Sequence, residues 1–368
     1  MTKLISFFKA NTVFCLAAFL AFVTAFYVPP SMEYISYIDF RVLGLLFSLM
    51  TVVAGLQKAG IFAMITVRLF RFLKTVRQMA GVMIFACFFA SMWITNDVSL
   101  ITFVPFALVA FHEAGEEKEL IKLVVLQTIA ANLGSMCTPV GNPQNLYLYL
   151  VSGMGAFSFV SLLLPYTVIS FILLCLSLFW FPGRPVKALN GGLVRWPVHQ
   201  LFLYGFLFLS CMLTVGNIVD WRLTAGLVLG AVLFFDRPVL KRVDYILLLT
   251  FAAFFIFIGN LKHIDFIYTF LTAHTEGHEF LVSLLASQVI SNVPAAILLS
   301  GFTENFEGLM LGTDIGGLGT MIASMASLIS YKIYTVRLGQ AGQFLFTFTW
   351  VNVVFLIILV GCYAVIGK

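Results

Sequence analysis

The chain has 368 residues, of which 61% are hydrophobic and only 10% are charged. Soluble proteins carry about 25% charged residues, so this composition excludes a soluble globular domain and indicates a membrane protein with several spans. The formal net charge of +5 comes from basic residues spread over many short loops, which argues against nucleic acid as a partner and suits orientation in a membrane.

The length allows roughly ten membrane-depth segments at about 20 residues per span. An N-terminal span with an outer loop is expected at 1–38, a first unit at 39–181, linker spans at 182–242 and a second unit at 243–368. The first apolar run is long and lacks a convincing cleavage site, which favours a retained span over a signal peptide. Most basic residues fall on one side of this arrangement, so we expect a multi-pass protein of the inner (plasma) membrane with a cytoplasmic N-terminus.

Basic side chains recur every three or four residues between the second span and the first polar segment. Arg68, Arg71, Lys74 and Arg77 alternate with apolar residues over 65–78. This pattern is typical of an amphipathic helix on the inner membrane surface, although a basic loop face with no further role is the alternative.

The first polar segment lies within 79–111, where Thr95, Asn96 and Asp97 separate two apolar runs. Each run is expected to be too short to cross a membrane by itself. Polar groups cannot face lipid without a cost of several kcal/mol, so the segment is predicted to be a re-entrant hairpin with its tip inside the protein. An acid at that depth needs a cation, a proton or hydrogen bonds, here from Thr95, Ser99 or Thr102. A purely structural cap is the alternative for Asp97.

A broken helix is predicted at 120–151. The segment from Thr138 to Asn145 contains two prolines and a glycine, which cannot continue an α-helix. The carbonyl groups released by such a break are suitable sodium ligands, because sodium prefers hard oxygen donors. A passive kink is the alternative interpretation.

The second unit repeats this order, with a hairpin at 279–301 and a broken helix at 308–332. The hairpin tip reads Ser291, Asn292, Val293 and Pro294, and the break contains Gly316, Gly317 and Gly319. Aligned without gaps, 132–138 matches 314–320, and the match continues to Tyr149 with Tyr331. The first unit is expected to begin outside and the second inside. This predicts an all-α polytopic protein with an inverted repeat, in which a substrate binds where the two units meet.

The chemistry of these segments suits a small anion and a coupling ion. The amides of Asn96 and Asn292 can donate to an anion, and helices that begin just past each tip add positive dipole ends. Capping of the second hairpin helix is the simpler role for each amide. Candidate substrate-binding residues are Asn96, Thr138, Pro139, Asn142, Ser291, Asn292 and Thr320. Candidate coupling-ion residues are Thr95, Asn96, Asp97, Gly134, Gly141, Ser291, Asn292, Gly316 and Gly319.

With these motifs the chain resembles the ion transporter superfamily, which includes divalent-anion/sodium symporters, arsenite permeases, NhaD-type antiporters and citrate carriers. The resemblance covers roughly 40–181 and 243–366. It implies a homodimer in which a scaffold domain holds a transport domain that moves like an elevator, coupled to sodium or protons. The dicarboxylate branch carries Ser-Asn-Thr at both tips. Here the tips read Thr-Asn-Asp and Ser-Asn-Val, and the acid is closer to the arsenite permease pattern.

These observations favour an ion-coupled secondary transporter of a carboxylate or an inorganic oxyanion. A sodium/proton antiporter of the same fold is the main alternative, and a channel is a further one. No nucleophilic triad, phosphate-cradling loop or nucleotide signature is visible, so neither an enzyme nor an ATP-driven pump is expected. The expected ligands are a small anion, lipid, and Na⁺ or H⁺ as the coupling ion, with no other cofactor.

Overall fold

The computed structural model describes residues 11–70, 73–186 and 197–367. These residues form helices and no strand, apart from one isolated bridge between Thr75 and Pro185. Within the described ranges, six helices are long and apolar enough to cross a membrane, which confirms an all-α polytopic membrane protein. These six are Phe40–Lys58, Val76–Ile94, Ala156–Trp180, Val198–Val215, Tyr245–Lys262 and Ala341–Ile366.

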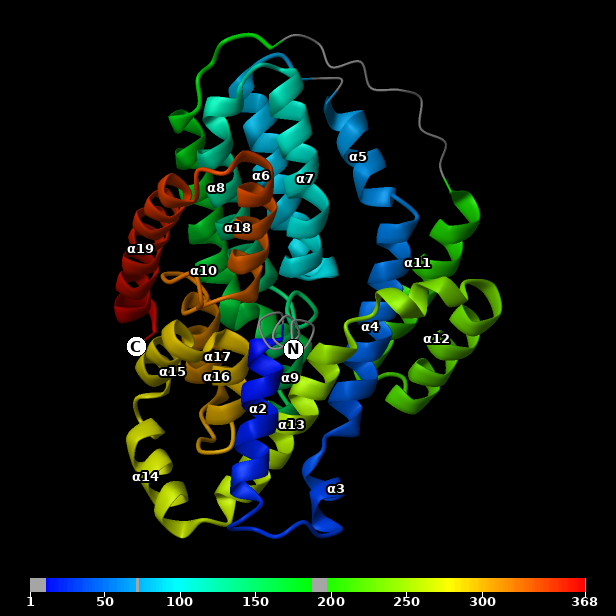
Figure 1. Ribbon diagram of the computed structural model, residues 1–368, viewed down its shortest axis with the longest axis vertical. Coiled ribbons are helices and arrows are strands. Elements are labelled where there is room, and N and C mark those ends of the chain that lie inside the picture. Colours follow the sequence, from blue (N-terminus) through cyan, green and yellow to red (C-terminus); the bar gives the residue numbers. More distant parts are fainter. Residues whose placement is uncertain (1–10, 71–72, 187–196, 368) are drawn as a thin grey trace, which may run out of the picture.

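Helices outside the polar segments form the right side and the lower end of the molecule in Figure 1. They are α2 (Thr12–Thr24), α3 (Glu33–Tyr37), α4 (Phe40–Lys58), α5 (Ile61–Phe70), α11 (Val198–Val215), α12 (Trp221–Phe235), α13 (Tyr245–Lys262) and α14 (Asp265–Thr275). Glycines on α4 allow close packing, because a Cβ atom at Gly55 would lie 2.0 Å from the Tyr204 ring of α11. The two repeat units start alike: Asp39 caps α4 and Asp244 caps α13, each accepting a backbone N–H at 3.0 Å.

The first polar unit consists of a helical hairpin and an interrupted helix. Its elements are α6 (Val76–Ile94), α7 (Asn96–Glu113), α8 (Leu120–Ser135), α9 (Pro143–Ser152) and α10 (Ala156–Ser177). The helix α8 stops before the Thr138–Asn145 segment, and α9 starts with Pro143 at its first position, where proline is tolerated. The expectation that each hairpin arm is too short to cross a membrane is wrong for α6, which has 19 residues.

The second polar unit has the same order, with shorter helices in its hairpin. Its elements are α15 (Glu279–Ile290), α16 (Asn292–Leu299), α17 (Phe306–Ile315), α18 (Met325–Leu338) and α19 (Ala341–Ile366). The first hairpin lies in the upper half of Figure 1 and the second hairpin in the lower half. Both helix interruptions therefore occur in the middle of the molecule, as an inverted repeat predicts.

The predicted amphipathic helix over 65–78 is wrong as a single element. The helix α5 is described as far as Phe70, Leu73 and Lys74 lie outside any helix, and Thr75 caps the start of α6 by accepting the Gln78 N–H at 3.3 Å. Thr75 is β-branched and has an extended conformation, which interrupts helical hydrogen bonding between the two segments. Arg71 lies outside the described residues, and Lys74 is exposed between the two helices.

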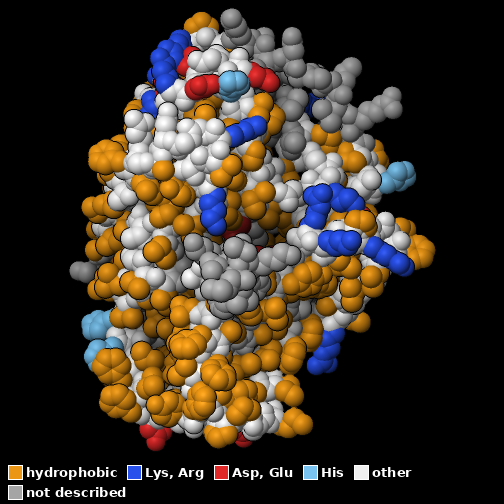
Figure 2. Space-filling model, viewed as in Figure 1, with side chains coloured by type: hydrophobic (Ala, Val, Ile, Leu, Met, Phe, Trp, Pro, Cys, Tyr) orange, Lys and Arg blue, Asp and Glu red, His pale blue; other side chains and the backbone are white. Residues whose placement is uncertain are grey.

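The surface fits a bilayer environment. Figure 2 shows hydrophobic side chains over most of one face, with Lys and Arg gathered toward the upper end and the right edge. Large aromatic side chains are strongly exposed on α10 and α19, for example Phe157 (86%) and Phe346 (74%). Lipid-facing helices are expected to present such residues, whereas a soluble protein rarely exposes large contiguous apolar patches.

Candidate functional site

The two hairpin tips have the same backbone conformation. Thr95 has φ 70° and ψ 152°, and Ser291 has φ 74° and ψ 155°. Positive φ is uncommon for residues other than glycine and costs of order 1–3 kcal/mol, so the surrounding structure must hold both residues in place. Asn96 N–H donates to the Gly141 carbonyl at 3.1 Å, and Asn292 N–H donates to the Ala323 carbonyl at 2.9 Å. Each tip is thus bonded to the broken helix of its own unit.

The side-chain amides of the tips also match. Asn96 Oδ1 accepts the Asp97 N–H at 2.9 Å, and Asn292 Oδ1 accepts the Val293 N–H at 3.0 Å. The capping role considered from the sequence is wrong, because the N-cap positions are Thr95 and Ser291 and neither helix has a side-chain cap hydrogen bond. The Nδ2 groups remain to contact the centre of the molecule. The contact with the next N–H and a ligand contact are compatible, because they use different atoms of the amide.

A chain of polar contacts connects the tips across the centre. Asn96 Nδ2 donates to Asn132 Oδ1 at 3.1 Å, and Asn132 Nδ2 donates to the Gly317 carbonyl at 3.4 Å. Gly317 adjoins the second tip, because a Cβ atom there would lie 3.1 Å from Asn292 Nδ2. Both asparagines are buried, with exposures of 5% and 4%. The structure therefore brings Asn96 and Asn292 into one central region instead of leaving them at opposite surfaces.

The two broken helices interlock by reciprocal contacts. Asn132 of the first unit accepts a hydrogen bond from Ser324 Oγ of the second unit at 3.0 Å. Asp314 of the second unit accepts one from Asn142 Nδ2 of the first unit at 3.2 Å. The alignment that pairs Asn132 with Asp314 also pairs Asn142 with Ser324. These two contacts are thus the same contact made in both directions, as expected for a repeat with approximate two-fold symmetry.

The threonines of the two breaks bind the hairpins. Thr138 Oγ1 donates to the Met92 carbonyl, and Thr320 Oγ1 donates to the Gln288 carbonyl at 3.0 Å, each three residues before a tip. Gln288 also donates from Nε2 to the Gly316 and Leu318 carbonyls at 2.7 and 2.9 Å, and accepts the Thr320 N–H. The hydroxyl groups of Thr138 and Thr320 thus donate their protons to carbonyl groups of the protein. Their oxygens remain as acceptors, which suits a cation better than an anion.

Several predicted ion-site glycines have a visible packing role. A Cβ atom at Gly134 would lie 2.1 Å from the Phe88 carbonyl oxygen, and one at Gly141 would lie 1.9 Å from the Ser135 carbonyl oxygen. In the second unit, a Cβ atom at Gly316 would lie 3.0 Å from the Leu284 backbone. Gly319 has φ 99°, a conformation that disfavours other residues. The broken helices therefore contact the hairpins through backbone atoms.

Asp97 does not receive all of the hydrogen bonds expected from the sequence. Ser99 Oγ donates instead to the Cys87 carbonyl at 3.1 Å, and Thr102 Oγ1 accepts from Gln57 Nε2 at 3.3 Å. The two hydroxyls contact neighbouring helices, that of Ser99 contacting α6 and that of Thr102 contacting α4. Among the described residues, Asp97 Oδ1 is buried without a hydrogen-bond partner.

Within the described ranges, three further buried oxygens near the breaks have no hydrogen-bond partner: Asp314 Oδ2, Asn145 Oδ1 and Ser327 Oγ. Asn145 and Ser327 correspond by the same alignment, and the side chains of Asn145 and Gln144 face Asp314. Buried polar atoms are normally paired with protein groups or ordered water, so these oxygens are candidate contacts for water or a ligand. Oxygen atoms of this kind bind hard cations such as Na⁺, and a carboxylate also binds a proton.

The sequence-based site list omitted several of these residues. Asn132, Gln288, Ser324 and Asp314 make central contacts but were not included among the candidates. For three of them the signal that could have found them was the gapless alignment, since extending it pairs Asn132 with Asp314 and Ser324 with Asn142. Pro139 makes no side-chain hydrogen bond by its chemistry, and its contribution is to the break itself.

Comparison with known protein families gives a match over most of the chain. A profile of the citrate transporter family, CitMHS, matches residues 3–305. The chain belongs to the citrate transporter family. This membership confirms the resemblance to the ion transporter superfamily, and it identifies the protein as a membrane transporter.

Relatives of this citrate transporter family member carry transporter or membrane-protein names. An uncharacterized transporter of Methanocaldococcus jannaschii is 32% identical over 331 residues, covering 90% of this chain and 91% of the relative. The inner membrane protein YbiR of Escherichia coli is 29% identical over 315 residues, covering 82% and 81%. The silicon efflux transporter LSI3 of Oryza sativa is 32% identical over 160 residues, covering 42% of this chain and 31% of the relative.

Proposed function

We propose that this transporter carries a small anion, a carboxylate or an inorganic oxyanion, by ion-coupled alternating access. The observation that carries the proposal is the contact chain from Asn96 through Asn132 and Gly317 to Asn292. It gives two amide groups and two helix N-termini at one buried centre. Helix N-termini carry partial positive charge, and amide N–H groups donate hydrogen bonds, so both favour a bound anion.

The proposed anion contacts are Asn96, Thr138, Asn142, Ser291, Asn292 and Thr320, with Pro139 shaping the break. For Thr138 and Thr320 the contact requires a change of hydroxyl partner, because both now donate to hairpin carbonyls. The names of the family and of a silicon efflux relative are compatible with either a carboxylate or a weak oxyacid as substrate.

The proposed coupling ion is Na⁺ or H⁺, held by the tip and break residues Thr95, Asn96, Asp97, Gly134, Gly141, Ser291, Asn292, Gly316 and Gly319. Support comes from the unpaired Asp97 Oδ1 and from the hydroxyl oxygens of the breaks, which remain acceptors. Elevator movement of the hairpin units, a homodimer, and an inner-membrane location with a cytoplasmic N-terminus complete the proposal. These last features rest on the superfamily resemblance and the distribution of basic residues.

The direct test is uptake by purified full-length protein in liposomes. Labelled citrate, succinate, arsenite and silicic acid are offered with and without inward Na⁺ and H⁺ gradients. We expect gradient-dependent uptake of one of these classes and faster labelled uptake after preloading with the unlabelled compound. Uptake that is insensitive to preloading indicates a channel and contradicts a carrier.

A sodium/proton antiporter is the second candidate, favoured by the acid at the first tip. Asp97→Asn distinguishes the two. If sodium-dependent pH changes in liposomes occur without uptake of any anion, and Asp97→Asn abolishes them, exchange replaces anion transport as the function.

A further inference from the structure

A large apolar groove runs along one face of α6, away from the polar centre. It has a volume of about 880 Å³ and lies between α5, α6 and α7. Its α6 residues recur every four positions, at Gly81, Phe85, Phe89 and Trp93, with Phe62 and Ile65 of α5 opposite. This spacing places them in one stripe on a helix. The groove thus follows α6 for most of its length, about 25 Å at 1.5 Å per residue.

The groove is open to the surroundings of the protein. Phe89 and Trp93 are 51% and 50% exposed, and Ile65 on the opposite helix is 44% exposed. The small residues Gly81 and Ala86 also line it. In a bilayer such a surface is covered by hydrocarbon, and the groove is longer than the depth of one leaflet, about half of 30 Å. An acyl chain therefore fits its shape and its chemistry.

One end of the groove is polar and basic. Arg77 and Gln78 lie there, at the start of α6. Arg77 donates from Nε to the Phe181 carbonyl at 3.1 Å and stacks over the Phe179 ring at 5.2 Å. The Gln78 oxygen accepts the Lys74 N–H at 2.8 Å, which leaves Nε2 as its donor.

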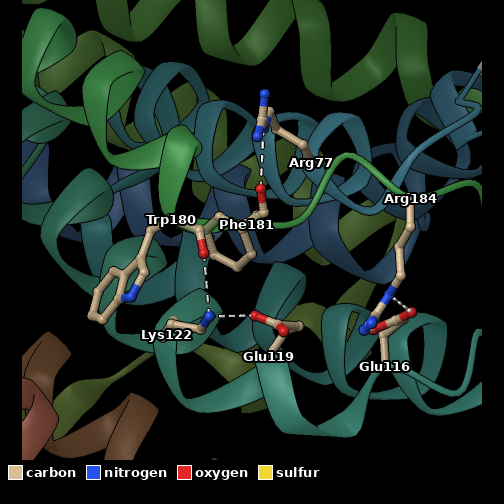
Figure 3. A network of polar contacts seen from close by, with 7 residues as sticks. All are labelled: Arg77, Glu116, Glu119, Lys122, Trp180, Phe181 and Arg184. Carbon is tan, nitrogen blue, oxygen red and sulfur yellow. Dashed lines mark hydrogen bonds and ion pairs between the residues drawn. The ribbon is translucent and has the colours of Figure 1, made fainter.

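The charge of Arg77 is not neutralised by the protein, in contrast to its neighbours. Figure 3 shows Arg184 paired with Glu116 and Lys122 paired with Glu119, whereas Arg77 contacts a backbone carbonyl. Within the described ranges, no Asp or Glu forms an ion pair with Arg77. A cation beside an apolar groove at the membrane surface attracts an anionic head group. The distribution of basic residues assigns this end to the cytoplasmic leaflet.

We propose that this groove binds an anionic glycerophospholipid. Its phosphate lies at Arg77 and Gln78, and one acyl chain follows α6 past Phe85 and Phe89 to Trp93. The deep end is bounded by Trp93, whose ring lies 6.4 Å from that of Phe208 on α11. The lipid would therefore contact the first hairpin and the helices beside it at the same time.

The test uses tryptophan quenching by lipids with dibrominated acyl chains. Full-length protein is reconstituted in phosphatidylcholine with increasing fractions of brominated phosphatidylglycerol or brominated phosphatidylcholine. The difference between wild type and Trp93→Phe isolates the Trp93 signal. We expect half-quenching of this signal at an about fivefold lower fraction of the anionic lipid, the preference that one basic contact supplies.

Three variants separate head-group from chain binding. Arg77→Gln should remove the preference for phosphatidylglycerol, and Arg77→Lys should keep most of it. Ala86→Phe places a large side chain in the groove without changing its charge and should weaken quenching by both lipids. Arg242→Gln removes an exposed basic residue outside the groove and is the matched control, for which wild-type behaviour is expected.

Two results overturn the proposal. Equal quenching of wild-type Trp93 by both lipids means that the groove holds hydrocarbon without recognising a head group. Quenching by neither lipid means that a second copy of the chain or another protein covers the groove. Because Ala86→Phe leaves the Arg77 contact with Phe181 intact, the groove remains testable if Arg77→Gln fails to fold.

Discussion

The two halves of the molecule hold their polar tips in the same backbone conformation, but the charge next to the two tips differs. Thr95 and Ser291 share one backbone conformation, and the amide oxygens of Asn96 and Asn292 each accept the N–H of the next residue. After the asparagine, however, the first half has Asp97 and the second has Val293. Near the breaks the acid is in the second half, where Asp314 corresponds to Asn132 of the first half. The repeated contacts hold the two halves alike, and the unmatched acids are where the halves differ in charge.

The largest expected effect is loss of either tip amide. Asn96→Ala and Asn292→Ala should each lower uptake of the transported anion by roughly 10- to 100-fold, because a hydrogen bond to a charged group contributes about 1.5–3 kcal/mol. Similar losses at both tips support a shared anion site. Initial uptake rates in liposomes measure the effect. Asn352→Ala, which removes a buried amide from α19, is the control and should keep near-normal uptake. A loss confined to one tip would break the functional symmetry of the two hairpins.

Close packing of a broken helix on its hairpin gives the next effect. Gly134→Ala places a methyl group against the Phe88 carbonyl and should destabilise the protein by about 1–3 kcal/mol. Gly312→Ala should behave alike, because its Cβ atom would lie 2.4 Å from the Phe280 carbonyl. Thermal unfolding in detergent provides the measurement. Gly205→Ala, on a helix with open space around the added methyl group, should not be destabilising. An unchanged melting temperature for Gly134→Ala would contradict the contact.

The smallest effect concerns the acid that differs between the breaks. Asp314→Asn makes the second break match Asn132 of the first. The new amide can still accept from Asn142 and can donate to Asn145 Oδ1, which has no partner within the described ranges. Since a buried unpaired carboxylate oxygen costs free energy, we expect stability to rise by about 1 kcal/mol.

This variant also sharpens the comparison between the acids. If Asp314 only supports the fold, uptake by Asp314→Asn keeps its dependence on the Na⁺ or H⁺ gradient. Lower stability than wild type, measured by the same thermal unfolding assay, would show that the carboxylate is favourably solvated or paired at its site.

Much of this architecture could be predicted from local patterns. The prolines and glycines of 138–143 and 316–319 cannot continue a helix, so both breaks were predictable from residue type. Each tip stood out as polar residues within an apolar run. The amphipathic pattern over 65–78 was misleading, because periodicity does not show that Thr75 starts a new helix. The length of α6 was also missed, since basic and polar residues at 77–78 belong to a helix that is otherwise apolar.

The contacts between units could not be predicted in the same way. Asp314 meets Asn142 across 172 positions, and Asn132 meets Ser324 across 192. No local propensity encodes such a pair. Ser99 was expected to serve Asp97, but its hydroxyl bonds the Cys87 carbonyl, because packing of α7 on α6 decides which neighbour a side chain meets. Only the repeat itself, extended residue by residue, offered a route to these contacts.

The glycine contacts between hairpin and broken helix limit how this protein can move. At Gly134 and Gly312 backbone lies directly against backbone, so there is no layer of side chains along which the two elements could slide. Each hairpin and its broken helix form one mechanical unit. For the proposed alternating access, the polar centre would therefore open to one face of the membrane and then the other by displacement of whole units about their connections, and α5 is one such link.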